Sequence, residues 1–301
     1  MRNRFTGAVI AVAILTCSAL VIAQGRGRQG GAAAPAPPPA QGREGTAGPG
    51  GGQAPIPCVN QWQRPNGCAK PTGTLKARDL SGVWFRSKGS ANFGAGAADL
   101  LTPAGRQAYL SYKPSFGPRA IPPALGNDPI GNCDPMGLTR NLFTEIAGRS
   151  TEFIHSPDRI VQFFEYAHQY RTIWLDGRAL PSKNVEPRWM GYSTGHWEGD
   201  TLVVDTNGLD DRNWADMWGD PLSANARVQE RYRRTAFDTM EFQMTLTDPD
   251  YYTKPVATDT KVYVLQIEKG MDERLEGFCV PSEEQAFNKT IRDPAAGVVN
   301  K

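Results

Sequence analysis

The chain has 301 residues, with 33 basic and 31 acidic side chains and a formal net charge of +2. A chain so nearly neutral lacks the extended basic face that nucleic-acid binding usually requires, so we expect no nucleic-acid partner. The length limits the architecture as well. Once the N-terminal region is set aside, roughly two hundred residues are left, which is enough for one sizeable core and one domain.

The first 23 residues have the pattern of a signal peptide. Arg2 and Arg4 precede an uncharged apolar run over residues 8–23, broken only by a short polar stretch around Cys17. The run is short for a bilayer span, so we expect cleavage near Gln24 and export to the periplasm or the extracellular space. A lipoprotein anchored through Cys17 is a weaker alternative. No second long apolar run follows, so no transmembrane segment is expected in the mature chain.

The next segment, residues 24–73, is rich in Gly, Ala, Pro and Gln and has almost no aliphatic side chain that could anchor a core. Such a composition predicts a disordered tether that acts as a spacer. A single β-rich domain is expected over residues 74–288. Residues 289–301 are expected to form a flexible tail.

Four cysteines remain after removal of the signal peptide, an even number in a chain bound for an oxidising compartment. Disulfides are therefore expected. Of the three possible pairings we favour Cys58 with Cys68, within the tether, and Cys133 with Cys279, joining the two ends of the domain. No two of them form a Cys-x-x-Cys pair, so the spacing does not fit a zinc site.

Strand patterns dominate the domain after one helix. The helix is expected over residues 101–112, with Thr102 as N-cap and Pro103 in the first turn. A first strand follows the turn before Val83. The other strands are bounded by turn residues and are expected at Thr151–Ile154, Arg159–Tyr166, Tyr170–Leu175, Trp189–Trp197, Thr201–Thr206, Arg227–Arg234, Met240–Thr247 and Lys261–Ile267.

Apolar and polar residues alternate most clearly over Met240–Thr247, so one face of this strand is expected to be buried and the other exposed to solvent. About eight such strands, joined by short turns without helices between them, predict an all-β antiparallel meander. Closure into a lipocalin-like barrel would remove the exposed sheet edges. A two-sheet sandwich is the alternative architecture.

Turn chemistry aligns two hairpins and brings candidate site residues together. In the first, pairing Tyr166 with Tyr170 would place Glu165 opposite Arg171 at the end of an apolar face. These two side chains form either a surface salt bridge above a core face or the polar rim of a pocket, with His168 at the loop tip as a titratable neighbour.

The second hairpin turns at Gly199-Asp200 and aligns Thr194 with Asp205 and His196 with Val203. Tyr192 shares this face, whereas Trp197 lies on the opposite one. If the first face lines the barrel lumen, its hydroxyl, imidazole and carboxylate groups could bind a ligand or move a proton. If it points outward, these side chains are merely solvated. The alternation does not decide between the two.

The loop over residues 207–223 holds four aspartates around Trp214 and Trp218. Its oxygen atoms could bind calcium, but their spacing does not fit an EF-hand. The favoured interpretation is a solvated lid whose two tryptophans contact a ligand at the barrel mouth. Nucleophile-elbow, Walker, dinucleotide-binding and His-Glu-x-x-His motifs are missing, and the three histidines are too few to favour a metal site, so none is expected.

The segments Ser156–Val161 (SPDRIV) and Gly195–Val204 (GHWEGDTLVV) resemble a family of uncharacterised exported bacterial proteins, and the similarity covers most of the domain. The family implies the limits of the domain but no activity. Its members often carry Gly-His-Pro-His-Ser where this chain has Gly219–Ser223 (GDPLS), so a role for those histidines is in doubt here. The Gly82-Val83-Trp84 start is also similar to the opening of lipocalin-like barrels.

These observations support three hypotheses, none of which requires a cofactor. The first is a barrel that binds a small, largely apolar molecule through residues such as Arg171, Tyr192, Thr194, Trp214 and Trp218. The second is an acid–base enzyme on the same barrel, an isomerase, hydratase or lyase, that uses Glu165 with His168 or His196 with Asp205. The third is a surface scaffold or adhesion module, which would show an apolar patch.

Overall fold

The computed structural model describes a two-stranded sheet and most of the domain, namely residues 58–59, 65–66, 73–145, 150–183, 185–267, 274 and 277–298. The expected signal peptide, most of the expected tether and Cys68 lie outside the described residues. The small sheet pairs β1 (Cys58–Val59) with β2 (Pro65–Asn66).

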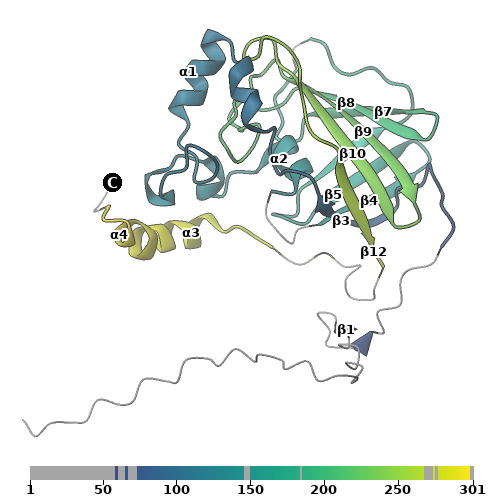
Figure 1. Cartoon of the computed structure of the whole chain (residues 1–301), viewed down its shortest axis with the longest axis horizontal. Helices are drawn as coiled ribbons and strands as arrows, with labels where there is room; N and C mark the ends of the chain where they lie inside the picture. The colour runs from purple at the N-terminus through teal and green to yellow at the C-terminus, as the bar shows by residue number, and fades with distance from the viewer. Residues whose placement is uncertain are drawn as a thin grey trace, which may run out of the picture. The chain divides into compact units, whose positions relative to one another are not determined.

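Nine strands close into one β-barrel, which confirms the expected all-β class and the closure of the sheet (Figure 1). The strands are β3 (Gly82–Lys88), β4 (Ser150–Ser156), β5 (Arg159–Phe164), β6 (Tyr170–Trp174), β7 (Tyr192–Glu198), β8 (Thr201–Asn207), β9 (Arg227–Ala236), β10 (Thr239–Thr247) and β12 (Lys261–Gln266). Each pairs with the next in this order, and β12 returns to β3. A short strand, β11 (Val256–Ala257), pairs with β10 as well.

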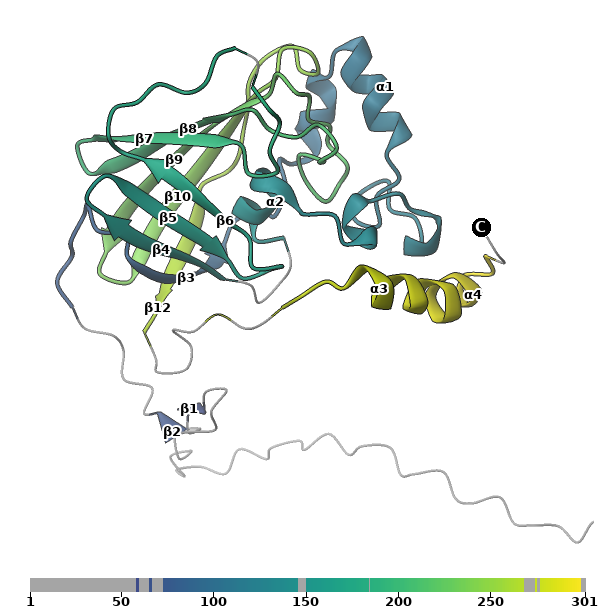
Figure 2. The same cartoon turned by 180° about the vertical axis from the view of Figure 1, so that it is seen from behind.

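The strand number has a topological consequence. Strands that alternate in direction around a closed ring must be even in number, so nine strands require one parallel pair. That pair is β6 with β7, joined only at Ile173–Ser193 and Trp174–Thr194, whereas the other eight pairings are antiparallel. The connection must therefore run back along the barrel from the end of β6 to the start of β7. Figure 2 shows it as a long loop outside the sheet, which we call the strap (residues 175–191).

Side chains fill the barrel interior. The alternation predicted for β10 holds, since the side chains of its even-numbered positions from Met240 to Leu246 are at most 1% exposed. Aromatic rings pack across the lumen in a chain of contacts from Phe153 through Tyr232 and Phe242 to Tyr263, with centroid separations of 5.3, 4.8 and 5.9 Å. The interior is thus a packed core.

Short helices surround one end of the barrel. The predicted first helix is α1 (Pro103–Ser111), and the Thr102 hydroxyl accepts a hydrogen bond from Gly105 N at 3.1 Å, as its N-cap role requires. The buried helix α2 (Gly137–Phe143) was not predicted. Three 3-10 helices complete this side: η1 (Ala95–Leu100), η2 (Pro123–Leu125) and η3 (Pro129–Asn132). No helix within the described parts of the chain is long and apolar enough to cross a membrane.

A disulfide between Cys133 and Cys279, with a Cα–Cα distance of 5.4 Å, confirms one predicted pairing. It fixes the C-terminal segment, which comprises α3 (Pro281–Phe287), the π-helix η4 (Asn288–Arg292) and α4 (Asp293–Ala295). The Asn288 side chain adds a hydrogen bond to Gly131 O. Residues 289–295 belong to η4 and α4 and are helical, whereas the sequence analysis assigned them to a flexible tail.

Candidate ligand-binding cleft at the barrel seam

The first predicted hairpin has a different register, and this changes the residue that lies opposite Arg171. Strand β5 pairs with β6 through Phe163–Tyr170 and Gln162–Arg171, so Glu165 does not face Arg171 and that prediction is wrong. The turn contains Ala167 and His168, with φ angles of 52° and 50°. The two registers differ by three residues, an odd number, and side chains alternate between the faces of a strand. Ile160 and Gln162 of β5 therefore share the inner face with Arg171, in place of the odd-numbered residues that the prediction put there.

Inside the barrel, the Arg171 guanidinium forms a two-point ion pair with Glu230. The Nη1–Oε1 and Nη2–Oε2 distances are 2.7 and 2.5 Å, and the two side chains are 2% and 0% exposed. Gln162 accepts from Nε and Nη2, and the Tyr232 hydroxyl donates to Glu230 at 2.5 Å. Every Arg171 nitrogen that can donate therefore has a partner within the protein.

Glu165 and His168, proposed as one acid–base pair, contact different segments. The Glu165 carboxylate is buried and accepts hydrogen bonds from Ser150 N and Oγ at 3.2 and 2.6 Å. The His168 ring accepts from Gly277 N through Nε2 and packs on Phe278, with ring centroids 4.4 Å apart. Both side chains thus help to hold neighbouring chain segments in place.

The second hairpin has the predicted register, with Thr194 opposite Asp205 and His196 opposite Val203. Its polar face is the outer one, because Leu202 and Val204 on the other face are fully buried. The His196 side chain is 58% exposed and lies 3.3 Å from Glu198. The solvated alternative therefore describes His196, and the lumen alternative is wrong.

The loop over residues 207–223 is packed into the protein, so the expected solvated lid is wrong. Trp214 is 2% exposed and stacks on Tyr112 with centroids 4.8 Å apart, while Trp218 is half-buried. The Asp216 carboxylate is buried and accepts from the backbone N–H groups of Phe93, Trp218 and Asp220. Across the described residues, no cluster of three or more acidic, His or Cys side chains could hold a metal ion.

Buried acids beside this loop have shifted proton affinities. Burial, together with the charge of Asp216 and a hydrogen bond to it, raises the pKa of Asp220 to about 9. Burial also raises the pKa of Glu145 to about 8, although the ion pair with Arg140 at 2.6 Å opposes the shift. One oxygen of Glu145, Oε1, has no hydrogen-bond partner. Both residues are at most 8% exposed and are part of the core.

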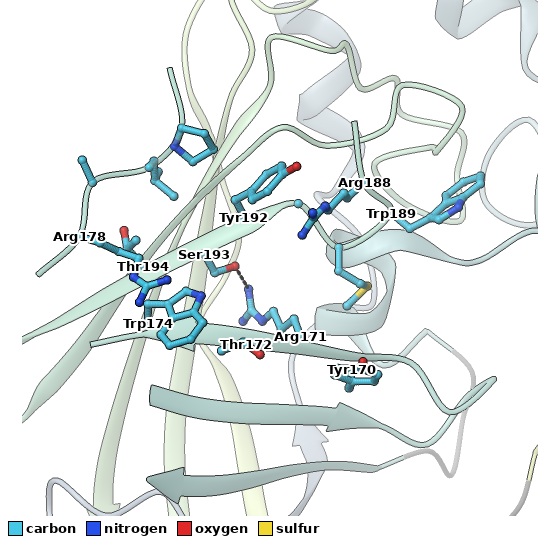
Figure 3. Close-up of a pocket in the computed structure, with 15 residues that line it drawn as sticks. Tyr170, Arg171, Thr172, Trp174, Arg178, Arg188, Trp189, Tyr192, Ser193 and Thr194 are labelled. Carbon is cyan, nitrogen blue, oxygen red and sulfur yellow. Dashed lines mark hydrogen bonds between the residues drawn. The ribbon is translucent and has the colours of Figure 1, made fainter. Parts of the chain in front are cut away.

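An open cleft of about 560 Å³ lies at the seam where β6 and β7 pair over only two residues. Figure 3 shows its labelled residues, with Arg171 and Ser193 meeting on the barrel side. The lining comes from β6, the strap and the start of β7: Tyr170, Arg171, Thr172, Trp174, Arg178, Ala179, Leu180, Pro181, Arg188, Trp189, Met190, Gly191, Tyr192, Ser193 and Thr194. It therefore combines three guanidinium groups with four aromatic rings and contains no acidic side chain.

Aromatic rings position two of these guanidiniums. The Arg178 Cζ lies 3.5 Å from the Trp174 ring centroid, and the Arg188 Cζ lies 4.2 Å from that of Tyr192. Stacking occupies the flat face of a guanidinium, whereas its N–H groups point outward along its edge. A stacked arginine is thus already oriented to donate two parallel hydrogen bonds to a carboxylate or phosphate.

The three arginines differ in how much of their charge is already neutralised. Arg171 is paired with Glu230, and Arg178 forms hydrogen bonds to both carboxylate oxygens of Asp176. Arg188 is exposed, and no described carboxylate lies within 4.0 Å of its side chain. The cation of the cleft that is open to an external anion is therefore Arg188.

Three of the predicted ligand-binding residues, Arg171, Tyr192 and Thr194, line this cleft together. Trp214, Trp218 and the four acid–base candidates do not. The sequence analysis missed Arg178 and Arg188, because they lie in the irregular strap and no local pattern places them beside Trp174 or Tyr192. No protein-family model, curated protein or solved structure matches this chain.

Proposed function

We propose that the chain is an exported binding protein whose ligand is a small molecule carrying an anionic group and a ring, held in the seam cleft. The observation that carries the proposal is Arg188, which stacks on Tyr192 and lines a cleft without acidic side chains. Its charge has no carboxylate partner among the described residues. The Tyr170 side chain, 62% exposed, offers an open aromatic surface for the ring of the ligand.

The barrel lumen is a poorer place for a ligand than the seam. Its interior is occupied by the aromatic contacts around Tyr232 and by the Arg171–Glu230 ion pair. A ligand there would have to displace packed side chains, whereas the seam cleft is already open. The ligand that suits the protein is therefore anionic rather than largely apolar. The Cys133–Cys279 disulfide and the signal-peptide pattern support the exported location.

Binding without catalysis is favoured over the acid–base enzyme. A general acid or base must lie within hydrogen-bonding distance of the reacting group, yet none of the four proposed acid–base residues lines the seam cleft. His196 pairs with Glu198 on the open outer surface, and Glu165 is engaged with Ser150.

The test measures affinity by calorimetry for benzoate, phenyl phosphate and glucuronate, each beside a neutral counterpart: benzamide, phenol and glucose. We expect at least one anion to bind, with its neutral counterpart at least about tenfold weaker, and Arg188→Ala to weaken the anion by about tenfold. The matched control is Arg233→Ala on the outer face of β9, away from the cleft. Equal binding of both members of every pair, or wild-type affinity of Arg188→Ala, would contradict the proposal.

A further inference from the structure

A row of side chains leads away from the seam cleft across the outside of the barrel. Strand pairing places Trp174 beside Thr194, Thr194 opposite Asp205, Asp205 opposite Gln229 and Gln229 opposite Thr245. Each of five successive strands, β6 to β10, contributes one residue. All lie on the outer face, because the alternate positions such as Val204, Glu230 and Met244 are fully buried.

A second hollow, of about 500 Å³, lies over this row. Its lining includes Thr194, Asp205, Gln229 and Thr245, with Leu180 of the strap on one side. Leu180 and Thr194 also line the seam cleft, so the two hollows are neighbours that share a boundary. A ligand longer than one ring could therefore extend from the first hollow into the second.

The second hollow has a different chemistry from the first. Its row displays hydroxyl, carboxylate and amide groups, and its lining contains one acidic side chain, Asp205, and one basic side chain, Arg227. The Gln229 amide donates to Asp205 Oδ1 at 3.0 Å, which fixes its orientation and leaves its own oxygen and Asp205 Oδ2 as acceptors. Threonine hydroxyls both donate and accept. A ligand with many hydroxyl groups, which also donate and accept, satisfies such a surface.

We infer that the ligand is an acidic oligosaccharide, with a uronic acid carboxylate bound to Arg188 in the seam cleft and the following sugars lying over the Thr194–Thr245 row. This inference rests on the proposed function and names its ligand class. Neighbouring strands are about 4.8 Å apart, so the four strands from β7 to β10 span about 14 Å, the length of a short oligosaccharide rather than of a single sugar.

The experiment is a chain-length series, measured by calorimetry on the mature protein with fragments of polygalacturonate, alginate and hyaluronan from one to six sugars. We expect affinity for at least one of these polymers to rise at least tenfold from one sugar to about four and then to level off. Gln229→Ala and Thr245→Ala should each weaken the tetramer about tenfold and leave the single uronic acid unchanged. Arg188→Ala should weaken every length.

Controls separate this inference from the proposed function. Gln243→Ala changes an exposed residue of β10 outside the second hollow, so it should bind the tetramer like the wild type. Single uronic acids that bind through Arg188 without any gain with length would overturn the oligosaccharide inference alone. Equal binding of neutral oligosaccharides of the same length would also overturn it. Failure of every anion, including the aromatic ones, to bind would overturn both proposals.

Discussion

Two regions of the molecule bury charged groups, and they balance that charge differently. In the barrel lumen, Arg171 and Glu230 neutralise one another, and Gln162 and Tyr232 complete their hydrogen bonds. Beside the 207–223 loop, acids outnumber bases, and burial raises the pKa of Asp220 to about 9 and that of Glu145 to about 8. In the lumen an ion pair compensates for burial, whereas beside the loop burial outweighs the ion pair of Arg140 with Glu145 and the acids keep their protons to higher pH.

The largest expected effect comes from breaking the lumen pair. Glu230→Gln leaves the Arg171 guanidinium buried without its counter-charge, and such a change typically costs about 3 to 5 kcal/mol. The free energy of unfolding from urea titration measures the loss. Removing one partner leaves the other charge buried and unpaired. We therefore expect the double variant Arg171→Met, Glu230→Leu to lose less stability than the single variant. A single variant as stable as the wild type would show that the lumen does not depend on pairing.

The sequence predicted this region only in part. It identified the strands β5, β6 and β9 from their composition, and it identified the register of the β7–β8 hairpin because Gly199, with a φ of 57°, marks the turn. It failed at the β5–β6 turn because Ala167 and His168 adopt positive φ there, where a Gly or Asn would have marked the turn in the sequence. Consequently Arg171 was placed opposite Glu165, and its real partner, 59 residues along the chain, was not found.

The number of strands had a similar effect on the site. All nine barrel strands have counterparts among the predicted segments, but an entirely antiparallel meander was expected, whereas an odd number of strands in a closed ring requires the parallel β6–β7 pair, the strap and the cleft. Local patterns predict strands but not how a ring of them closes.

The burial of the loop aspartates was also missed. The aspartates of the 207–223 loop were assigned to a solvated lid because Asp is usually exposed. The Asp216 carboxylate accepts a hydrogen bond from the backbone N–H of Phe93, which lies more than a hundred residues away in the chain, so no local pattern indicates it.

The loop region provides the second prediction, a stability that depends on pH. Above about pH 4 the unfolded chain releases the Asp220 proton, whereas the folded protein keeps it up to about pH 9. The folded state thus binds more protons over this range, and stability falls as pH rises. We expect Asp220→Asn to be more stable than the wild type at pH 8, with an advantage that shrinks by up to about 1.4 kcal/mol per pH unit as the pH is lowered and disappears near pH 4.

Chemical denaturation at pH 4, 6 and 8 measures this difference. A second variant, Glu145→Gln, removes the other acid with a raised pKa and should also reduce the pH dependence of stability. Asn at position 220 can still donate to the Asp216 carboxylate, so the loop should keep its structure. A wild type that gains stability between pH 5 and 8 would mean that the loop acids are ionised and paired after all.

The smallest effect on stability is expected for an arginine–glutamate ion pair on the surface of the barrel. Arg231 follows Glu230 in β9 and points to the opposite side, where it pairs with Glu198 at 2.8 Å and both side chains are about half exposed, at 43% and 50%. Water solvates either partner when the other is removed, so Glu198→Gln should leave the urea midpoint unchanged within error at physiological salt. A loss comparable to that of Glu230→Gln would show that pairing itself stabilises this barrel. Both ion pairs join an arginine to a glutamate, and they involve adjacent residues of one strand. A large loss of stability for Glu230→Gln and none for Glu198→Gln would therefore be due to the burial of the first pair.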